Sequence, residues 1–337
     1  MNEKVGQTSM GQLIKLQDFI SRYEQNIFSY PGRFVRLKVQ QWERTKENWE
    51  TEGIDASNLS ISPTSSPIEE EKQKQPLLGK IMGMLGRNQN EEVELPPVVV
   101  ETGAEGDPDE SSLQFSANIL TKPSNLDELK LQFLEQLFKF QMKWASSTLS
   151  EKSFLDSSYY HDENLKFFLQ RFPDTFLFLY RPVFLLKKAP IEAEIIMLTP
   201  TEAWCITFIE REDSAVFVGS NDRFWLKRNK NQEQKVLNPL MALNRTEKIV
   251  KKIFQLDGIE LPIHKLVLSR NGYIDFPNAP LGTEFVEKRN FETWFQRMRL
   301  LKSPLKHMQL KGAQSLLRYC QTTSVRRLEW EVSEENK

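Results

Sequence analysis

The spacing of apolar residues predicts alternating helices and strands from about residue 113 onward. The most regular stripe advances in steps of three and four residues, as one face of a helix does, and Ser124 or Asn125 stands where a helix cap is expected. Its members are Leu126, Leu129, Phe133, Leu137, Phe140 and Trp144. A second helix is predicted at 163–172. The continuous apolar run 176–186 is typical of a strand buried on both faces.

The stretch 190–212 predicts a β-hairpin with acidic residues at its ends. Two apolar runs, 195–198 and 203–209, are joined by a short polar turn. Glu194 precedes the first run and Glu210 follows the second. A hairpin of this kind would bring both carboxylates to neighbouring positions on one sheet, which is a possible metal site.

The elements after this hairpin complete an α/β arrangement. A short strand pair is predicted at 215–218 and 223–227, and a helix at 238–254 with Pro239 in its first turn. Beyond Gly258 the segment HKLVLS reads as another strand. The order of helix, strands, helix and strand predicts a mixed sheet flanked by helices within a domain at 113–330.

Residues 1–50 are expected to form an N-terminal helical hairpin. Leu13, Leu16, Ile20, Tyr23 and Ile27 recur at spacings of three and four, and a similar stripe follows the SYPG segment. Docking on the main domain, docking on a second copy of the chain and binding of another protein all remain open for this hairpin.

Residues 51–112 are predicted to be a disordered acidic linker. The segment is rich in Ser, Pro, Gly and Glu and has almost no aromatic residues, so it cannot bury enough apolar area to offset the entropy of ordering. Residues 52–112 carry thirteen acids against four bases. Within them, the apolar segment 76–87 is either a short helix that binds a partner or a membrane surface, or a transient hydrophobic island.

The C-terminal region 288–327 has the opposite charge, with ten bases against the single acid Glu292. Its apolar stripe predicts two amphipathic helices, whose outer faces carry the bases. Such a face is either solvated, held by the acidic linker, or able to bind the phosphates of DNA or RNA. The candidate nucleic-acid-binding residues are Arg289, Arg297, Arg299, Lys302, Lys306 and Lys311.

The cysteine content and the lengths of the apolar segments limit the classes of protein to which this chain can belong. Cys205 and Cys320 are the two cysteines and do not form a CxxC pair, so neither a disulfide framework nor a thiolate metal site is expected, and a reducing cytoplasm is favoured. No window reaches the length of apolar residues that a membrane span needs, and no signal peptide is evident.

Four segments resemble the nuclease-related domain called NERD, whose members are similar to PD-(D/E)xK nucleases. The segments are EAEIIML, AWCITFIERE, GSNDRFWLKR and NPLMALNRTEKIVKKI. In that family an Ile-Asp pair opens one strand, Ile-Glu-x-Lys closes the next, and a Trp and an Asn-Pro follow. Here Glu194 stands at the Asp, Glu210 at the Glu, Trp225 at the Trp and Asn238 at the Asn. The resemblance covers less than half of the chain.

The resemblance implies a restriction-endonuclease-like core and, if the protein is active, a Mg²⁺ or Mn²⁺ site at Glu194 and Glu210. The family's motif is incomplete, because Glu212 occupies the lysine position and reverses its charge. Two alternatives would complete the site: Lys227 or Lys235 supplies the missing cation from the next loop, or Glu212 acts as a third metal carboxylate. Glu194, Glu210, Glu212 and Lys227 are therefore the candidate catalytic residues; alternatively, the three acids are solvated residues at strand ends.

The sequence gives less support to histidine-based catalysis or nucleotide binding. His161, His264 and His307 are the three histidines and lie in separate predicted elements, and no phosphate-binding or dinucleotide-binding glycine motif occurs. Three functions follow as hypotheses. The protein binds nucleic acid with weak or lost nuclease activity, or it is an active metal-dependent nuclease, or it is a protein-interaction scaffold that uses the N-terminal hairpin and the linker.

Overall fold

The computed structural model describes residues 8–58, 115, 117, 121–186, 189–210, 213–230 and 232–327, with side chains described for all of these except 52–58. One compact unit comprises the described residues up to Glu47 and from Phe115 onward, and residues 48–114 form a second unit. The candidate linker, apart from the end of the first helix, and its segment 76–87 lie outside the described residues, as does Glu212.

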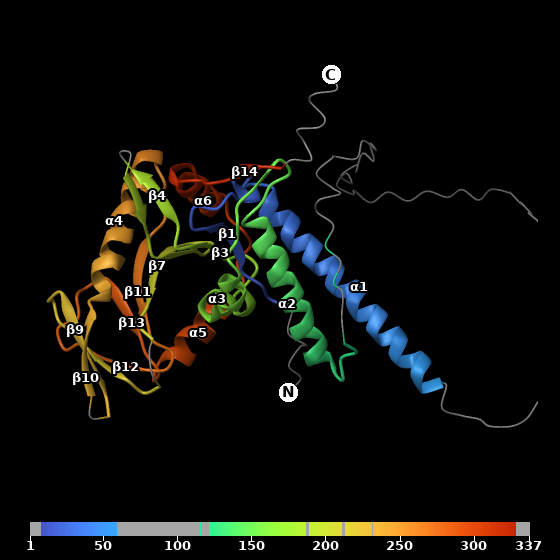
Figure 1. Cartoon of the computed structure of the whole chain (residues 1–337), viewed down its shortest axis with the longest axis horizontal. Coiled ribbons are helices and arrows are strands. Elements are labelled where there is room, and N and C mark those ends of the chain that lie inside the picture. The colour runs from blue at the N-terminus through green and yellow to red at the C-terminus, as the bar shows by residue number, and fades with distance from the viewer. Residues whose placement is uncertain are drawn as a thin grey trace, which may run out of the picture. The chain divides into compact units, whose positions relative to one another are not determined.

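A six-stranded mixed sheet lies at the centre of the first unit (Figure 1). Its strands, in spatial order, are β1 (Gln12–Leu16), β3 (Leu177–Tyr180), β6 (Ile195–Leu198), β7 (Ala203–Phe208), β11 (Ile263–Leu268) and β13 (Thr283–Val286). β6 runs antiparallel to both of its neighbours, whereas the other pairs are parallel. The predicted α/β class with a mixed sheet flanked by helices is confirmed.

Helices cover both faces of this sheet. On one face, α3 (Glu163–Arg171) packs Phe168 against Phe178 of β3 and Phe208 of β7, and α5 (Phe291–Arg299) packs on α3 through aromatic rings. On the other face, α4 (Pro239–Asp257) contacts β7 and β11, and α6 (His307–Tyr319) packs against α4. The two faces are therefore distinct environments for the side chains that alternate along β7.

Local sequence signals set the ends of these helices. The side chain of Asn125 accepts a hydrogen bond from the Glu128 amide and caps α2 (Leu126–Trp144), as predicted. Asn238 caps α4, Pro239 occupies its first turn, and the helix ends at Gly258, whose φ of 64° is the left-handed conformation that favours glycine. These signals act within one turn of a helix, so they are visible in the sequence.

The N-terminal segment is not a helical hairpin, and that prediction is wrong. Residues Gln12–Leu16 form β1, which is buried along its whole length and pairs with β3. A short 3-10 turn, η1 (Arg22–Glu24), separates β1 from α1 (Tyr30–Asn58). The apolar spacing that imitates a helix comes from a strand buried on both faces, where every position is apolar or tightly paired. The N-terminus is thus part of the central sheet.

The apolar run 176–186 also differs from its prediction, because it forms two strands. β3 ends at Tyr180, and β4 (Val183–Leu186) pairs with β5 (Ala189–Glu192) in a separate hairpin. Arg181 has a φ of 49° and the next residue is Pro182, so the chain turns sharply at this point. The turn directs β4 away from the central sheet.

A second sheet of four strands contacts the edge strand β13 of the first through the rings of Trp225 and Phe285. Its spatial order is β10 (Gln232–Leu237), β9 (Phe224–Asn229), β8 (Val216–Val218) and β12 (Tyr273–Asp275). The predicted pairing of 215–218 with 223–227 is confirmed by β8 and β9. The remaining short elements are η3 (Ser157–His161) and the strand pair of β2 (Glu151–Lys152) with β14 (Val325–Arg326).

Candidate functional site

Glu194 directly precedes β6, on the face of the sheet that α4 covers. Ile195 pairs with Ile206, so the register places Glu194 opposite Thr207 of β7. The Glu194 amide donates a 2.8 Å hydrogen bond to the Thr246 hydroxyl of α4. Burial raises the pKa of the Glu194 carboxyl, while the hydrogen bond from Thr207 and the nearby guanidinium groups of Arg181 and Arg245 lower it. A half-buried carboxylate in this setting is less stable as an anion than one in water.

Glu210 lies just beyond the end of β7 and is held by Arg270. Its Oε1 accepts from the Arg270 amide at 2.7 Å and from Nε at 2.8 Å, and its Oε2 accepts from Nη2 at 2.7 Å. The same guanidinium donates to Asn164 of α3 and lies over the rings of Phe167 and Phe208 at 4.7 and 5.1 Å. Both carboxylate oxygens of Glu210 are therefore committed to one structural ion pair.

The two acids project from opposite faces of the sheet. Side chains alternate along a strand, so Thr207 and Phe208 point to different sides, and Glu210 shares the side of Phe208. The contacts agree with this assignment, because the Glu194 carboxyl is hydrogen-bonded by Thr207 whereas Arg270 joins Glu210 to Asn164 of α3. The expectation that the hairpin brings both carboxylates together is wrong. Among the described side chains, no group of three potential ligands could hold a metal ion.

Lys227 belongs to the second sheet, whereas Glu194 lies beside β6 of the first. It lies on β9 opposite Gln234 and Phe217, on the same side of the strand as Trp225, and is largely buried. Since β9 and β6 belong to different sheets, the role of Lys227 as a catalytic cation stays a prediction. Glu212 is not described, so its role stays a prediction.

Trp225 and Asn238 hold one turn in place. The Trp225 Nε1 donates to the Ser220 carbonyl at 2.9 Å, and the Asn238 Nδ2 donates to the Ser220 and Asp222 carbonyls at 3.2 and 2.8 Å. Asn238 also caps α4 through its side-chain oxygen. These contacts give both motif residues a structural role: they fix where α4 begins relative to the second sheet.

A polar cluster on the α4 face was not predicted as a site. Lys265 lies in the middle of β11, opposite Cys205 of β7. Its Nζ is 2.9 Å from the Asn244 Oδ1 and 3.3 Å from the Glu247 Oε2, and its side chain is only 14% exposed. The available sequence signal was a lysine inside the apolar strand segment HKLVLS.

The candidate nucleic-acid-binding residues lie in two regions, around α5 and on α6. Arg289 pairs with Glu287, Arg297 makes two hydrogen bonds to Glu284, and Arg299 lies over the Phe295 ring. Lys302 follows α5, whereas Lys306 and Lys311 belong to the start and outer face of α6; all three are exposed. Because α5 and α6 pack on different helices, the bases do not form the single outer face that their sequence proximity suggested.

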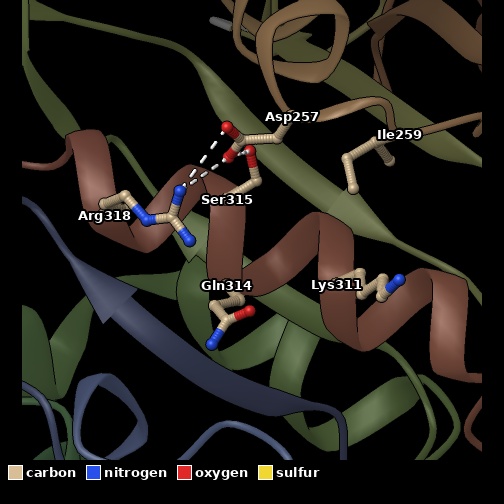
Figure 2. Close-up of a pocket in the computed structure, with 6 residues that line it drawn as sticks. All are labelled: Asp257, Ile259, Lys311, Gln314, Ser315 and Arg318. Atoms are coloured by element: carbon tan, nitrogen blue, oxygen red, sulfur yellow. Dashed lines mark hydrogen bonds and ion pairs between the residues drawn. The ribbon is translucent and has the colours of Figure 1, made fainter.

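A surface cleft of about 210 Å³ lies between the end of α4 and α6 (Figure 2). Asp257 accepts a 2.6 Å hydrogen bond from the Ser315 hydroxyl and pairs with Arg318 at 3.3 Å. Figure 2 shows both side chains turned toward Asp257, whereas the Lys311 ammonium points away from that carboxylate. The cleft therefore combines one neutralised acid with one exposed lysine.

Replacing Glu194 by glutamine is expected to raise the free energy of unfolding at neutral pH. The folded-state pKa of this carboxyl is higher than its ordinary value of 4.5, so folding favours the protonated form, and that contribution is lost as the pH rises through the folded-state pKa. Denaturant unfolding of both proteins from pH 4 to pH 8 measures the effect. The stability advantage of Glu194→Gln should shrink toward acid pH, and an advantage that is constant with pH would contradict this account.

Comparisons with known proteins give one informative relative. No protein-family model matches the chain, and no solved structure matches it. A curated protein named RNA 2',3'-cyclic phosphodiesterase, from Geobacillus stearothermophilus, is 34% identical over 135 residues. The match covers 39% of this chain and 36% of that protein. None of the described helices combines the length and apolar character that crossing a bilayer requires. The chain is thus similar, over about a third of that protein's length, to a protein named for RNA phosphodiester chemistry.

Proposed function

We propose that this protein binds RNA through a NERD-like core of the PD-(D/E)xK type, in which the family's metal-dependent cleavage is weak or lost. The observation that carries the proposal is the order α3, β3, β6, β7, α4 and β11, which remains when the strands outside the central sheet are set aside and follows the helix, three strands, helix and strand expected for such a core. Glu194 at the start of β6 stands where the family's first acid is expected. Fold alone does not specify function, so the remaining support comes from the site residues.

RNA is the proposed nucleic acid because of the relative's name. The curated protein that matches 39% of this chain is named for an RNA phosphodiester. A protein that binds RNA needs exposed cations that reach phosphates, and Lys302, Lys306 and Lys311 are exposed. Arg289 and Arg297 contribute less, because Glu287 and Glu284 already neutralise them.

The ion pair between Glu210 and Arg270 supports weak or lost metal-dependent cleavage. A carboxylate that binds Mg²⁺ or Mn²⁺ must direct a free oxygen lone pair at the ion, together with a second ligand. Glu210 directs both oxygens at Arg270, on the face opposite Glu194. An active nuclease that uses Glu194 and Glu210 as joint metal ligands would first have to break this pair.

Removing the two exposed lysines of the α6 region is expected to weaken RNA binding and its salt dependence. Each phosphate contact on a single strand contributes about 0.7 to the slope of log K against log salt, so Lys306→Ala/Lys311→Ala should reduce the slope by about 1.4. Fluorescence anisotropy titrations with single-stranded RNA at several salt concentrations measure it.

The matched control for this pair is Arg297→Ala, which removes a base already neutralised by Glu284. It should change the slope by much less than the lysine pair does. Equal slopes for wild type and the double variant would remove these lysines from the interface. Absence of RNA binding at low salt in the wild-type protein would overturn the proposed function and favour a protein-interaction role.

A further inference from the structure

The four-stranded sheet, at the lower left of Figure 1, has one buried face and one face open to solvent. On the buried face Trp225, Phe217 and Lys227 are enclosed, and the Trp225 ring packs against Phe276 at 5.3 Å and Phe285 at 6.4 Å. Side chains alternate along a strand, so the residues between these positions point the other way. This open face consists of residues that are all exposed or half-buried: Val216, Val218, Phe224, Leu226, Arg228, Glu233, Lys235, Leu237, Tyr273 and Asp275.

Two aromatic rings on the open face are joined by an apolar strip. Phe224 is 47% exposed, and Tyr273 is half-buried. Leu226 follows on the same face of β9, and the strand register leads from Leu226 to Val218 and from Val216 to Tyr273. Two strand spacings across the sheet and four residues along it separate the rings by about 17 Å. A ligand that contacts both rings must therefore be extended.

Cations lie over both rings. The Arg223 guanidinium is 5.5 Å from the centroid of the Phe224 ring. Lys288 and Arg289 lie over the Tyr273 ring at 6.0 and 5.4 Å. All three cations are exposed, so each can move from its ring to a nearby phosphate when another flat group stacks on that ring.

The open face carries a surplus of positive charge. With the three cations above, Arg228 and Lys235 make five basic residues against the acids Glu233, Asp275 and Glu287. Glu233 pairs with Arg228, but both side chains are more than half exposed, and an ion pair of this kind contributes little to stability. A phosphate can therefore replace the Glu233 carboxylate beside Arg228.

We propose, on the basis of the RNA binding proposed above, that the open face binds single-stranded RNA. Unpaired nucleobases stack on Phe224 and Tyr273, and the surrounding basic side chains contact the phosphates between them. Sites for single strands combine these two components, because every nucleobase has a flat apolar face and every phosphate a negative charge. Base-paired RNA does not offer its nucleobase faces in this way.

The cleft of Figure 2 lacks one of these components. Lys311 and Arg318 supply positive charge there, but none of its lining residues is aromatic. Such a cleft can hold a phosphate and cannot stack a nucleobase. The open face thus adds contacts to the nucleobases, which the exposed lysines of the α6 region do not provide.

The test measures the Kd of the full chain for a labelled single-stranded RNA of about 12 nucleotides, within the usual site size for such proteins. Phe224→Leu and Tyr273→Leu should each raise the Kd by about fivefold. This is the lower end of the loss seen when a stacking ring is removed, because leucine keeps part of the apolar contact. Both changes together should raise the Kd by about 25-fold, since positions this far apart act independently.

Two control variants match the ring substitutions. Phe154 lies outside this sheet, is 76% exposed and has a cation over its ring, Lys152 at 5.9 Å. Phe154→Leu should therefore bind RNA like wild type if an exposed ring with a cation is not sufficient by itself. Tyr273→Phe keeps the ring of the open face and should also bind like wild type.

Two further measurements separate stacking from charge. The ring variants should leave the slope of log K against log salt unchanged, whereas Lys235→Ala should reduce it by about 0.7, the contribution of one phosphate contact on a single strand. An abasic strand of the same length keeps the phosphates and lacks the nucleobases. Wild-type protein should bind it more weakly than the natural strand, and Phe224→Leu/Tyr273→Leu should lose most of this preference.

The outcomes separate this inference from the proposed function. Wild-type protein that binds natural and abasic strands equally would overturn the stacking assignment and leave RNA binding intact. A double ring variant with the wild-type Kd would also overturn it and would favour a protein partner for the open face. Wild-type protein that binds neither strand would overturn both proposals. If Tyr273→Leu does not fold, Phe224→Leu still decides, because the Phe224 side chain is 47% exposed.

Discussion

Glu210→Gln is expected to lower the free energy of unfolding by about 3 kcal/mol, the lower end of the range for breaking a buried ion pair. The side chains of Glu210 and Arg270 are 14% and 23% exposed, and three hydrogen bonds join them. A glutamine has one acceptor oxygen in place of two and carries no charge. The guanidinium would therefore lose a hydrogen bond and remain half-buried without a counterion. Chemical denaturation at neutral pH measures the change.

The sign of this effect distinguishes a structural acid from a ligand-binding one. An acid kept in a site for a metal or substrate usually costs stability in the absence of its ligand, so its replacement stabilises the protein. Glu194→Gln is expected to stabilise and Glu210→Gln to destabilise. Arg270→Met should resemble Glu210→Gln, because both leave one charge unpaired. A stable Glu210→Gln protein would contradict the structural role of this pair and return Glu210 to the list of candidate metal ligands.

Asp174→Asn is expected to cost about 3 to 5 kcal/mol, because it leaves a fully buried lysine without its counterion. The Lys38 ammonium of α1 is paired with Asp174 and hydrogen-bonded to the Thr8 carbonyl, and its side chain is 0% exposed. The other Asp174 oxygen accepts from the Met10 amide at 2.7 Å. One carboxylate therefore joins α1 and the segment before β1 to the loop before β3.

A double variant checks that the cost comes from the unpaired charge. Lys38→Met/Asp174→Asn removes both charges and keeps an acceptor for Met10, so it should recover most of the lost stability. The pH dependence gives a second check. Burial lowers the pKa of Lys38 from 10.5 and Asp174 raises it, so loss of Asp174 lowers it further.

The sign of that pH dependence follows from proton binding. Below pH 10.5 the unfolded chain binds the lysine proton more tightly than the folded protein, so the stability of Asp174→Asn relative to wild type should rise as the pH increases toward 10.5. A double variant as unstable as the single one would show that packing, and not the lysine charge, accounts for the loss.

Helices with local signals could be predicted from the sequence. The caps at Asn125 and Asn238 and the glycine end at Gly258 act on the nearest turn; the Asn125 cap and the first-turn position of Pro239 lie where the pattern predicts. β1 could not be predicted in this way, because its partner β3 lies about 165 residues away and the strand is buried on both faces. The spacing of apolar residues alone cannot distinguish such a strand from part of a helix.

The candidate site was predicted in part, and the missing information was strand register. The turn that pairs Leu198 with Ala203 places Glu194 opposite Thr207, three residues before Glu210. An odd offset along a strand changes the face, so the register alone separates the two acids. Lys265 lies opposite Cys205 through the parallel pairing of β11 with β7, a contact between distant segments that no local pattern encodes.

The most direct test of the central claim is equilibrium binding of wild-type protein to single-stranded RNA and to DNA of the same sequence at low salt. The 2′-hydroxyl is the group by which a protein distinguishes the two strands at a given site. If this protein acts on RNA, anisotropy titrations should show saturable binding to RNA that unlabelled RNA displaces more effectively than unlabelled DNA. Binding to neither strand, or equal displacement by DNA, would contradict the claim.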